Sequence, residues 1–150
     1  MAQTSWTDAD FDRISWHDNH VHGFRIEEGE HGTCTLFLDI DHIVEWLPPE
    51  DDRFSFMIAP ATLAFTGVFG LKIHLDWATI GAGMTPFSLS QITRTRLDYP
   101  GWSWAIEVNW PEGVISFEAT GFTQVLRGAP IRSWGQCLTT AERGSVLPGA

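Results

Sequence analysis

Short stretches in which apolar and polar side chains alternate run along most of the chain. Every second side chain is apolar in residues 33–41 (TCTLFLDID), 71–77 (LKIHLDW) and 102–109 (WSWAIEVN). A spacing of two residues places successive side chains on opposite faces of a β-strand. The pattern therefore predicts strands that each bury one face.

Turn sequences rich in glycine, proline and acidic residues separate these stretches. They are residues 28–32 (EGEHG), 47–52 (LPPEDD), 100–101 (PG) and 110–113 (WPEG). Glycine and proline supply the backbone angles that reverse the chain. Strong helical periodicity is absent, and only residues 138–143 have a short helical character. We therefore expect an all-β fold, an antiparallel sandwich or barrel of about 8–10 short strands with little helix.

The length of 150 residues fits a single domain that can bury a core without disulfide or metal support. Residues 1–12 and 130–150 have the weakest pattern, so we expect these termini to be less ordered. Residues 13–19 and 21–28 are predicted to be extended, and a hairpin across residues 29–32 is the simplest connection to the next strand.

Two aspartates alternate with apolar residues in the strand predicted at 33–41. Leu36, Leu38 and Ile40 share one face, which we expect to be buried, and Asp39 and Asp41 share the other. Paired carboxylates are an acid/base device of hydrolases. A face turned to water is the favoured interpretation, because solvated acids are the normal surface of an acidic domain.

The formal net charge is −10, with nineteen acidic residues against nine basic ones and Lys72 as the single lysine. Nucleic-acid binding depends on Lys and Arg side chains that displace counterions from phosphates, so this composition argues against it. Adsorption to an anionic membrane is disfavoured for the same reason. A basic protein partner fits the charge.

The sequence also bears on location. No stretch approaches the roughly 18 to 20 apolar residues that cross a bilayer. A secretory signal begins with a positive charge and continues with an apolar core. The first residues of this chain have no positive charge before Arg13 and no such core. We therefore expect a cytoplasmic protein.

Half of the six histidines lie in residues 15–22 (SWHDNHVH). In an extended strand, Asp18, His20 and His22 would share one face and could offer two imidazoles and a carboxylate to a divalent transition metal. His74 is the candidate for a third imidazole. The alternative is a polar strand face exposed to water, because a metal site needs three or four converging ligands.

Other chemistry has weaker signals. Cys34 and Cys137 form no metal-binding or catalytic motif and are expected to be buried free thiols. No nucleophile elbow or phosphate loop is present, so the sequence favours a protein that is not an enzyme. Eight tryptophans leave a third alternative, a small-ligand-binding β-barrel lined by Trp. The residues considered for that lining are Trp16, Trp46, Trp77, Trp102 and Trp104.

The order of the strands resembles that of a family of uncharacterised small bacterial β-rich proteins, a domain of unknown function. The resemblance rests on the segment FTGVFGLKIHLDW and the hairpin WSWAIEVNWPEGVISFEATGF, and it extends over about residues 13–127. The pattern is also similar to that of some immunity proteins of bacterial toxin systems. It implies a cytoplasmic, non-catalytic binding protein whose acidic surface fits a basic toxin. A homodimer that pairs through an exposed edge strand is a further expectation.

Overall fold

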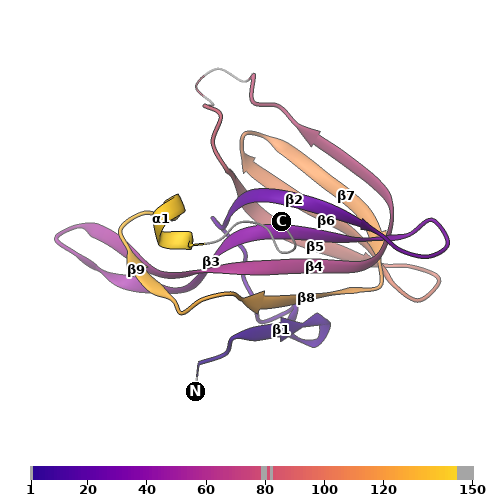
Figure 1. Cartoon of the computed structure of the whole chain (residues 1–150), viewed down its shortest axis with the longest axis horizontal. Coiled ribbons are helices and arrows are strands. Elements are labelled where there is room, and N and C mark those ends of the chain that lie inside the picture. The colour runs from indigo at the N-terminus through magenta and orange to yellow at the C-terminus, as the bar shows by residue number, and fades with distance from the viewer. Residues whose placement is uncertain (1, 79–80, 82, 145–150) are drawn as a thin grey trace.

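The computed structural model describes residues 2–78, 81 and 83–144 and confirms the all-β prediction: nine strands form one antiparallel sheet, with little helix (Figure 1). The strands are β1 (Ser5–Thr7), β2 (His20–Glu28), β3 (Cys34–Glu50), β4 (Arg53–Leu75), β5 (Phe87–Arg96), β6 (Trp102–Trp110), β7 (Gly113–Ala119), β8 (Gly121–Leu126) and β9 (Ile131–Ser133). The helices are the 3-10 helix η1 (Asp8–Asp10) and α1 (Thr140–Arg143). Neither helix is long and apolar enough to span a membrane, and the described residues hold no other.

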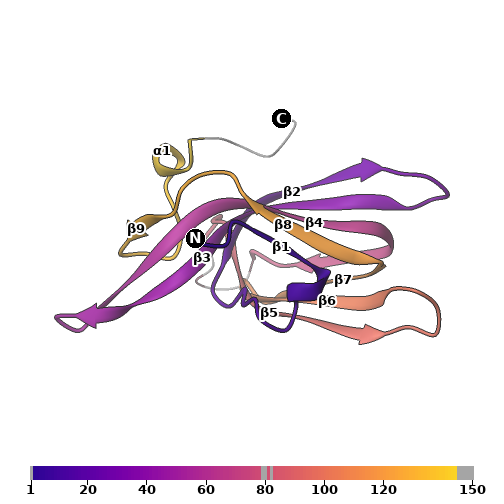
Figure 2. The same cartoon turned by 90° about the horizontal axis from the view of Figure 1, so that it is seen from below.

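The sheet folds back on itself. The strands pair in the order β4-β3-β2-β5-β6-β7, and β7 pairs again with β4. The β2–β5 junction is short, with only His20 opposite Ser88 and Val21 opposite Phe87. Figure 2 shows β2, β3, β4 and β8 in one layer and β5, β6 and β7 in the other. The architecture thus combines the two predicted arrangements: two layers, as in a sandwich, whose strands are connected at both sides, as in a barrel.

The strand β4 makes the closure possible. Its first part pairs with β3 and, on its other edge, with β8 and β9, whereas its last part pairs with β7. The change occurs where Gly67 and Gly70 have φ angles of +64° and +65° and the β7 register shifts between Phe69 and Lys72. Glycine adopts this left-handed conformation without a Cβ penalty, so β4 can bend there from one layer into the other.

Aromatic side chains fill the space between the layers. Trp104 packs edge-on against Phe65, with ring centroids 5.0 Å apart, and Phe65 packs in the same way against Phe117 at 4.8 Å. Trp16 is buried beside them and donates a hydrogen bond from Nε1 to Gln124 Oε1 at 2.7 Å. Edge-to-face pairs of this kind stabilise a core beyond the area that they bury. Trp16 and Trp104 therefore belong to the hydrophobic core.

The β3 alternation and the first hairpin agree with the predictions. Leu36, Leu38 and Ile40 are buried in this core, and β2 and β3 pair across residues 29–32. The predicted loop at 47–52 is shorter than expected, because β3 continues to Glu50. Its two prolines fall in a register shift between Leu47 and Glu50, where a missing N–H breaks no ladder hydrogen bond.

One prediction about the N-terminal region is wrong. Residues 13–19 are not a strand; they form turns and irregular backbone up to the start of β2. The termini, predicted at 1–12 and 130–150 to be less ordered, contain β1, η1, β9 and α1 within the described residues. These elements have three or four residues each, too few for a visible periodicity. Residues 1 and 145–150 lie outside the described part of the chain.

The pairing of β7 with β4, which closes the sheet, can be tested at Gly113. A Cβ at this position would overlap the backbone oxygen of His74 and approach Leu75 Cδ2 to 2.9 Å. We expect Gly113→Ala to lower the free energy of unfolding by about 1–3 kcal/mol, as overpacking does. Gly135→Ala is the matched control, because its Cβ would meet nothing within 4 Å. Urea denaturation measures both variants, and equal stabilities would contradict the role of this contact.

Candidate functional site

A buried polar cluster lies on the outer face of β2 and β3, beneath residues 127–143, which we call the C-terminal segment. Figures 1 and 2 show α1 on the side of β3 and β4 that faces away from β5, β6 and β7, and β9 pairs with the edge of β4. Asp39 is 3% exposed and Asp41 is fully buried. The prediction that these aspartates face water is therefore wrong, because the C-terminal segment covers them.

Two arginines neutralise the two aspartates. Arg143 donates hydrogen bonds to both Asp39 Oδ1 and Asp41 Oδ1, and Arg127 donates a second one to Asp39 Oδ1. Arg127 also donates to Thr62 Oγ1 at 2.8 Å. A buried carboxylate is tolerated only when it is paired and hydrogen-bonded. The cluster therefore ties the C-terminal segment to β3.

The second oxygen of Asp41 has partners from two other elements. His22 Nε2 and the backbone N–H of Leu138 each lie 2.7 Å from Oδ2 and donate to it. Because both oxygens are occupied, Asp41 is held in a fixed orientation. Asp41 is also fully buried and paired with Arg143, so the arrangement does not support the paired-carboxylate acid/base interpretation.

Cys137 lies next to the hydrogen bond between His22 and Asp41. Its Sγ lies 3.8 Å from His22 Nε2, and donor atoms of His22, Asp41 and Cys137 all lie within 4.8 Å of one another. Burial raises the pKa of the Cys137 thiol to about 11, and the nearby charge of Asp41 acts in the same direction. The thiol is therefore protonated at neutral pH in this structure.

His20 borders the cluster from β2. It lies opposite Asp41 in the sheet, and its Nδ1 is 3.2 Å from the backbone oxygen of Asp18. Burial lowers the pKa of His20, and the hydrogen bond to Asp18 and the charge of Asp41 oppose that effect. His22 is the extra residue of a β-bulge, because Val21 and Gly23 have successive partners on β3 while His22 has none.

The structure thus separates the four predicted metal ligands. His20 and His22 come together at the cluster. Asp18 is not on their strand, since it has a left-handed φ of +62° in a turn, where its Oδ2 accepts a hydrogen bond from Gln136 Nε2 at 3.1 Å. His74 is exposed on the part of β4 that pairs with β7, opposite Val114, outside the cluster.

Sequence reasoning missed Asp41 and Cys137 as neighbours of His22, and Arg127 and Arg143 as partners of the aspartates. The two aspartates in an otherwise apolar strand were the available signal. Nothing in the pattern of residues 127–143 indicates which strand face this segment covers.

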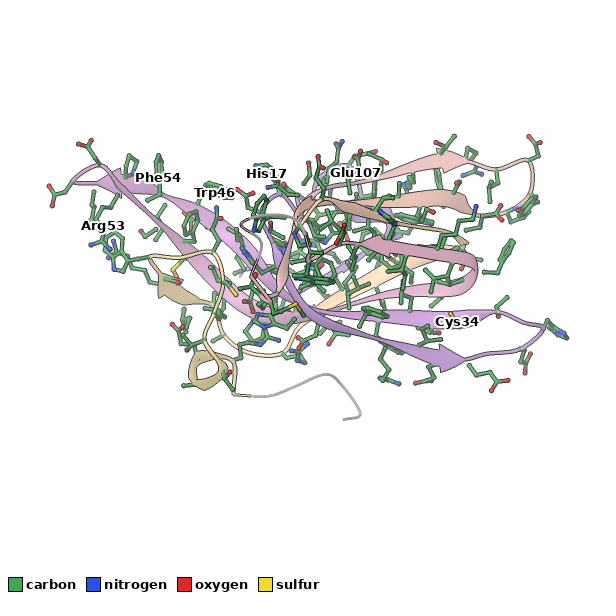
Figure 3. The ribbon with its side chains drawn as sticks, turned by 90° about the horizontal axis from the view of Figure 1, so that it is seen from above. His17, Cys34, Trp46, Arg53, Phe54 and Glu107 are labelled. Carbon is green, nitrogen blue, oxygen red and sulfur yellow. The ribbon has the colours of Figure 1, made fainter. Side chains whose placement is uncertain are left out.

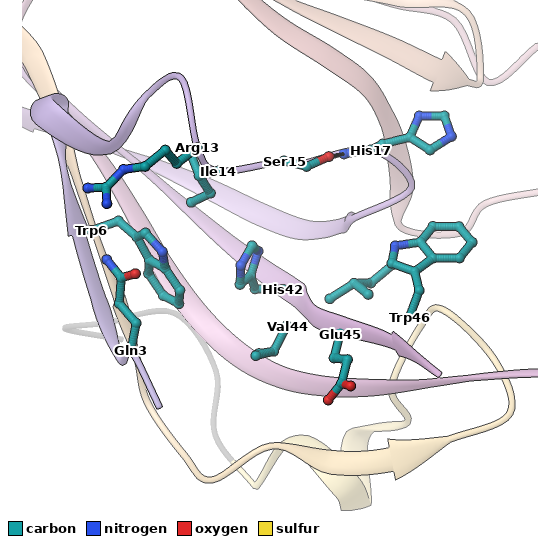
Figure 4. Close-up of a pocket in the computed structure, with 11 residues that line it drawn as sticks. Gln3, Trp6, Arg13, Ile14, Ser15, His17, His42, Val44, Glu45 and Trp46 are labelled. Atoms are coloured by element: carbon teal, nitrogen blue, oxygen red, sulfur yellow. Dashed lines mark hydrogen bonds between the residues drawn. The ribbon is translucent and has the colours of Figure 1, made fainter. Parts of the chain in front are cut away.

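A hollow of about 340 Å³ lies beside residues 42–46 of β3 and is bordered by aromatic side chains (Figure 4). Trp6, His17, His42 and Trp46 line it among others. His42 is buried edge-on against Trp6, with ring centroids 4.9 Å apart, and its Nδ1 accepts a hydrogen bond from Asn19 Nδ2 at 2.8 Å. Burial lowers the pKa of His42 to about 4, so its ring is neutral at physiological pH.

Comparisons with protein-family models, with curated proteins and with solved structures found no match to this chain. The resemblance to immunity proteins of toxin systems therefore stays an expectation from the sequence.

Removal of one partner from the cluster leaves an uncompensated buried charge. We expect Arg143→Gln to lower the free energy of unfolding by about 3–5 kcal/mol. Arg13→Gln is the control, because Arg13 forms an ion pair with Asp10 while its own side chain is 73% exposed; pairs of this kind contribute about 1 kcal/mol or less. Chemical denaturation at neutral pH compares the two. Similar losses of unfolding free energy in both variants would show that the cluster does not stabilise the fold.

The buried His42 predicts a pH dependence of stability. Its folded-state pKa of about 4 lies below the 6.5 of an ordinary histidine, so the unfolded chain binds the proton first as the pH falls. The free energy of unfolding should therefore decrease from about pH 6.5 to about pH 4, by roughly 3 kcal/mol in total for this one group. Below that range the contribution of His42 no longer changes.

Comparison with His42→Leu isolates this group from the carboxylates that titrate in the same range. Between about pH 7 and about pH 4.5 the wild type should lose roughly 2 kcal/mol more stability than the variant does. Parallel stability curves for the two proteins would contradict a neutral buried His42.

Proposed function

We propose that the protein is a non-catalytic binding protein whose acidic surface receives a basic protein partner. The observation that supports this proposal is that most of the basic side chains already form ion pairs with acids of the same chain. Six of the nine basic residues form ion pairs within the described residues. They are Arg13, Arg25, Arg94, Arg127, Arg132 and Arg143. Most of the positive charge is thus already paired, and the excess of acids is left for a partner.

The hairpin of β3 and β4 is the part of the surface that best suits such a partner. It projects from the sheet, and Asp51 and Asp52 lie at its tip, which we call the acidic tip; Glu50, next to them, is paired with Arg132 (Figures 1 and 3). Trp46 and Phe54 lie just behind the tip and are 48% and 58% exposed. Exposed aromatic side chains are typical anchors of protein interfaces. The hairpin therefore offers both apolar contact and negative charge.

The remaining parts of the proposal come from the sequence. The absence of a catalytic motif favours binding over catalysis, and the acidic composition favours a protein over a nucleic acid as partner. The resemblance to immunity proteins would make the partner a basic toxin, and the protein bacterial and cytoplasmic. The aromatic hollow at Trp6 and Trp46 has the size of a small-ligand site and supports the small-ligand alternative, with Trp46 as the one tryptophan of the predicted set among its lining residues.

A homodimer through an edge strand also remains a proposal. Beyond Val21, β2 pairs only with β3, and its other edge has no partner among the described residues. Phe24 and Ile26 are exposed on that part of β2.

Neutralisation of the acidic tip tests the proposal. Asp51 and Asp52 have left-handed φ angles of +48° and +62°, which asparagine tolerates. We expect Asp51→Asn/Asp52→Asn to weaken binding about tenfold, or 1.4 kcal/mol, and Phe54→Ala to weaken it independently of salt. The measurement is calorimetric titration with a protein first captured from cell extract at low salt, then identified and purified.

Glu28→Gln/Glu30→Gln is the matched control, since it makes the same change of charge at the tip of the β2–β3 hairpin. It should leave the affinity nearly unchanged. A captured partner that is acidic, or whose affinity is insensitive to salt, would refute the proposal.

A further inference from the structure

We propose that His22, Asp41 and Cys137 form a binding site for a zinc-like divalent transition metal ion. They offer one imidazole nitrogen, one carboxylate oxygen and one sulfur. Zinc binds these donor types, and the soft sulfur favours it over calcium or magnesium. The site does not depend on the proposed function. It also differs from the set predicted from sequence, because His22 alone is common to both.

The geometry is close to what tetrahedral coordination needs. Zinc–ligand bonds of about 2.0–2.3 Å place neighbouring donor atoms roughly 3.3–3.7 Å apart. Cys137 Sγ and His22 Nε2 are already separated by 3.8 Å. His22 Nε2 and Asp41 Oδ2, at 2.7 Å, share a hydrogen bond and must separate by about 0.6 Å to admit the ion. The ion also needs the lone pair of Nε2, so the proton that Nε2 donates to Asp41 is released to solvent while Nδ1 takes one up. A small rotation of the His22 ring, on the bulge of β2, accompanies this change of tautomer.

The surroundings hold the carboxylate in place for a metal. The N–H of Leu138 bonds to Asp41 Oδ2, the oxygen that faces the cluster, and Arg143 bonds to Oδ1. Contacts of this type orient metal ligands and limit their motion. Donors from β2, from β3 and from the C-terminal segment therefore meet at one point without any rearrangement of the backbone.

Access and charge are compatible with an ion. The His22 side chain is 20% exposed and Cys137 is only partly buried, so water can reach the site and fill the fourth position. Binding a divalent cation adds two positive charges, and release of the thiol proton to solvent leaves a thiolate on the metal. Formal charge rises by one in a protein of net charge −10. The negative charges of Asp41 and Glu142 act on the Cys137 thiol, and the positive charge of Arg143 opposes them.

Cobalt(II) titration of the untagged, reduced and metal-free protein tests the site. Cobalt occupies zinc sites and reports a bound thiolate by charge-transfer absorption in the near ultraviolet and a tetrahedral site by intense visible bands. We expect both signals in the wild type, and their loss when zinc is added. Cys137→Ser should abolish the charge-transfer band, and His22→Gln should weaken cobalt binding at least about tenfold.

The chain provides matched controls. Cys34→Ser removes the other thiol, and His74→Gln removes an exposed histidine; both should bind cobalt as the wild type does. Zinc should also raise the melting temperature of the wild type but not that of Cys137→Ser, because an ion that binds only the folded state stabilises it. Circular dichroism before metal addition verifies that each variant is folded.

Two results would overturn the proposal. One is a wild type that shows no charge-transfer band at cobalt concentrations well above that of the protein. The other is a band that survives in Cys137→Ser or disappears in Cys34→Ser. Either result would leave His22, Asp41 and Cys137 as a hydrogen-bonded cluster, and neither bears on the partner proposed for the acidic tip.

Discussion

The requirement that buried carboxylates have partners governs this structure. Asp39 and Asp41 lie on a strand whose other face fills the core, and both are removed from water. The sheet provides no cation for them except Arg127, just beyond the end of β8, so the chain must return with Arg143. The last described turn of the protein thus completes the environment of a strand that lies about a hundred residues earlier. Without that return, two charges would be exposed or left unpaired.

The neutral cluster can be set against the charge of the whole protein. The four charged members of the cluster sum to zero, so the whole net charge of −10 lies outside it. Two of only nine basic residues are consumed in the interior, and four more pair with acids elsewhere. Because the cluster removes two acids and two bases, the acidic character of the exterior comes from the composition of the rest of the chain. The acids at the tips of projecting hairpins, such as Asp51 and Asp52, carry a field that extends toward a partner.

The strand pattern was predictable because it depends on local alternation, and β3, β6 and the end of β4 follow it. Alternation tells which residues share a face, as for Asp39 and Asp41, but not what covers that face. The covering segment has no periodicity of its own, so its contacts arise only in three dimensions. Asp18 shows the converse failure: residues 13–19 are predicted to be extended, yet a left-handed turn takes Asp18 off the strand. His74 shares a strand with the core, but the bend at Gly67 and Gly70 directs that end of β4 toward β7.

The contacts that tie the C-terminal segment to β3 and the donors of the candidate metal site lie in the same place. Cys137, Leu138 and Arg143 all reach Asp41 or its neighbour His22 from the C-terminal segment. An ion held by Cys137 and His22 would therefore add a second tie between the same two parts of the chain. Its binding energy would appear as stability of the closed segment, because the donors converge only when the segment is docked. A displacement of about 0.6 Å, a change of His22 tautomer and loss of the Cys137 thiol proton separate the hydrogen-bonded His22–Asp41 pair from a coordinated one. The fold therefore needs no metal to form the cluster, and the same three side chains could accept one.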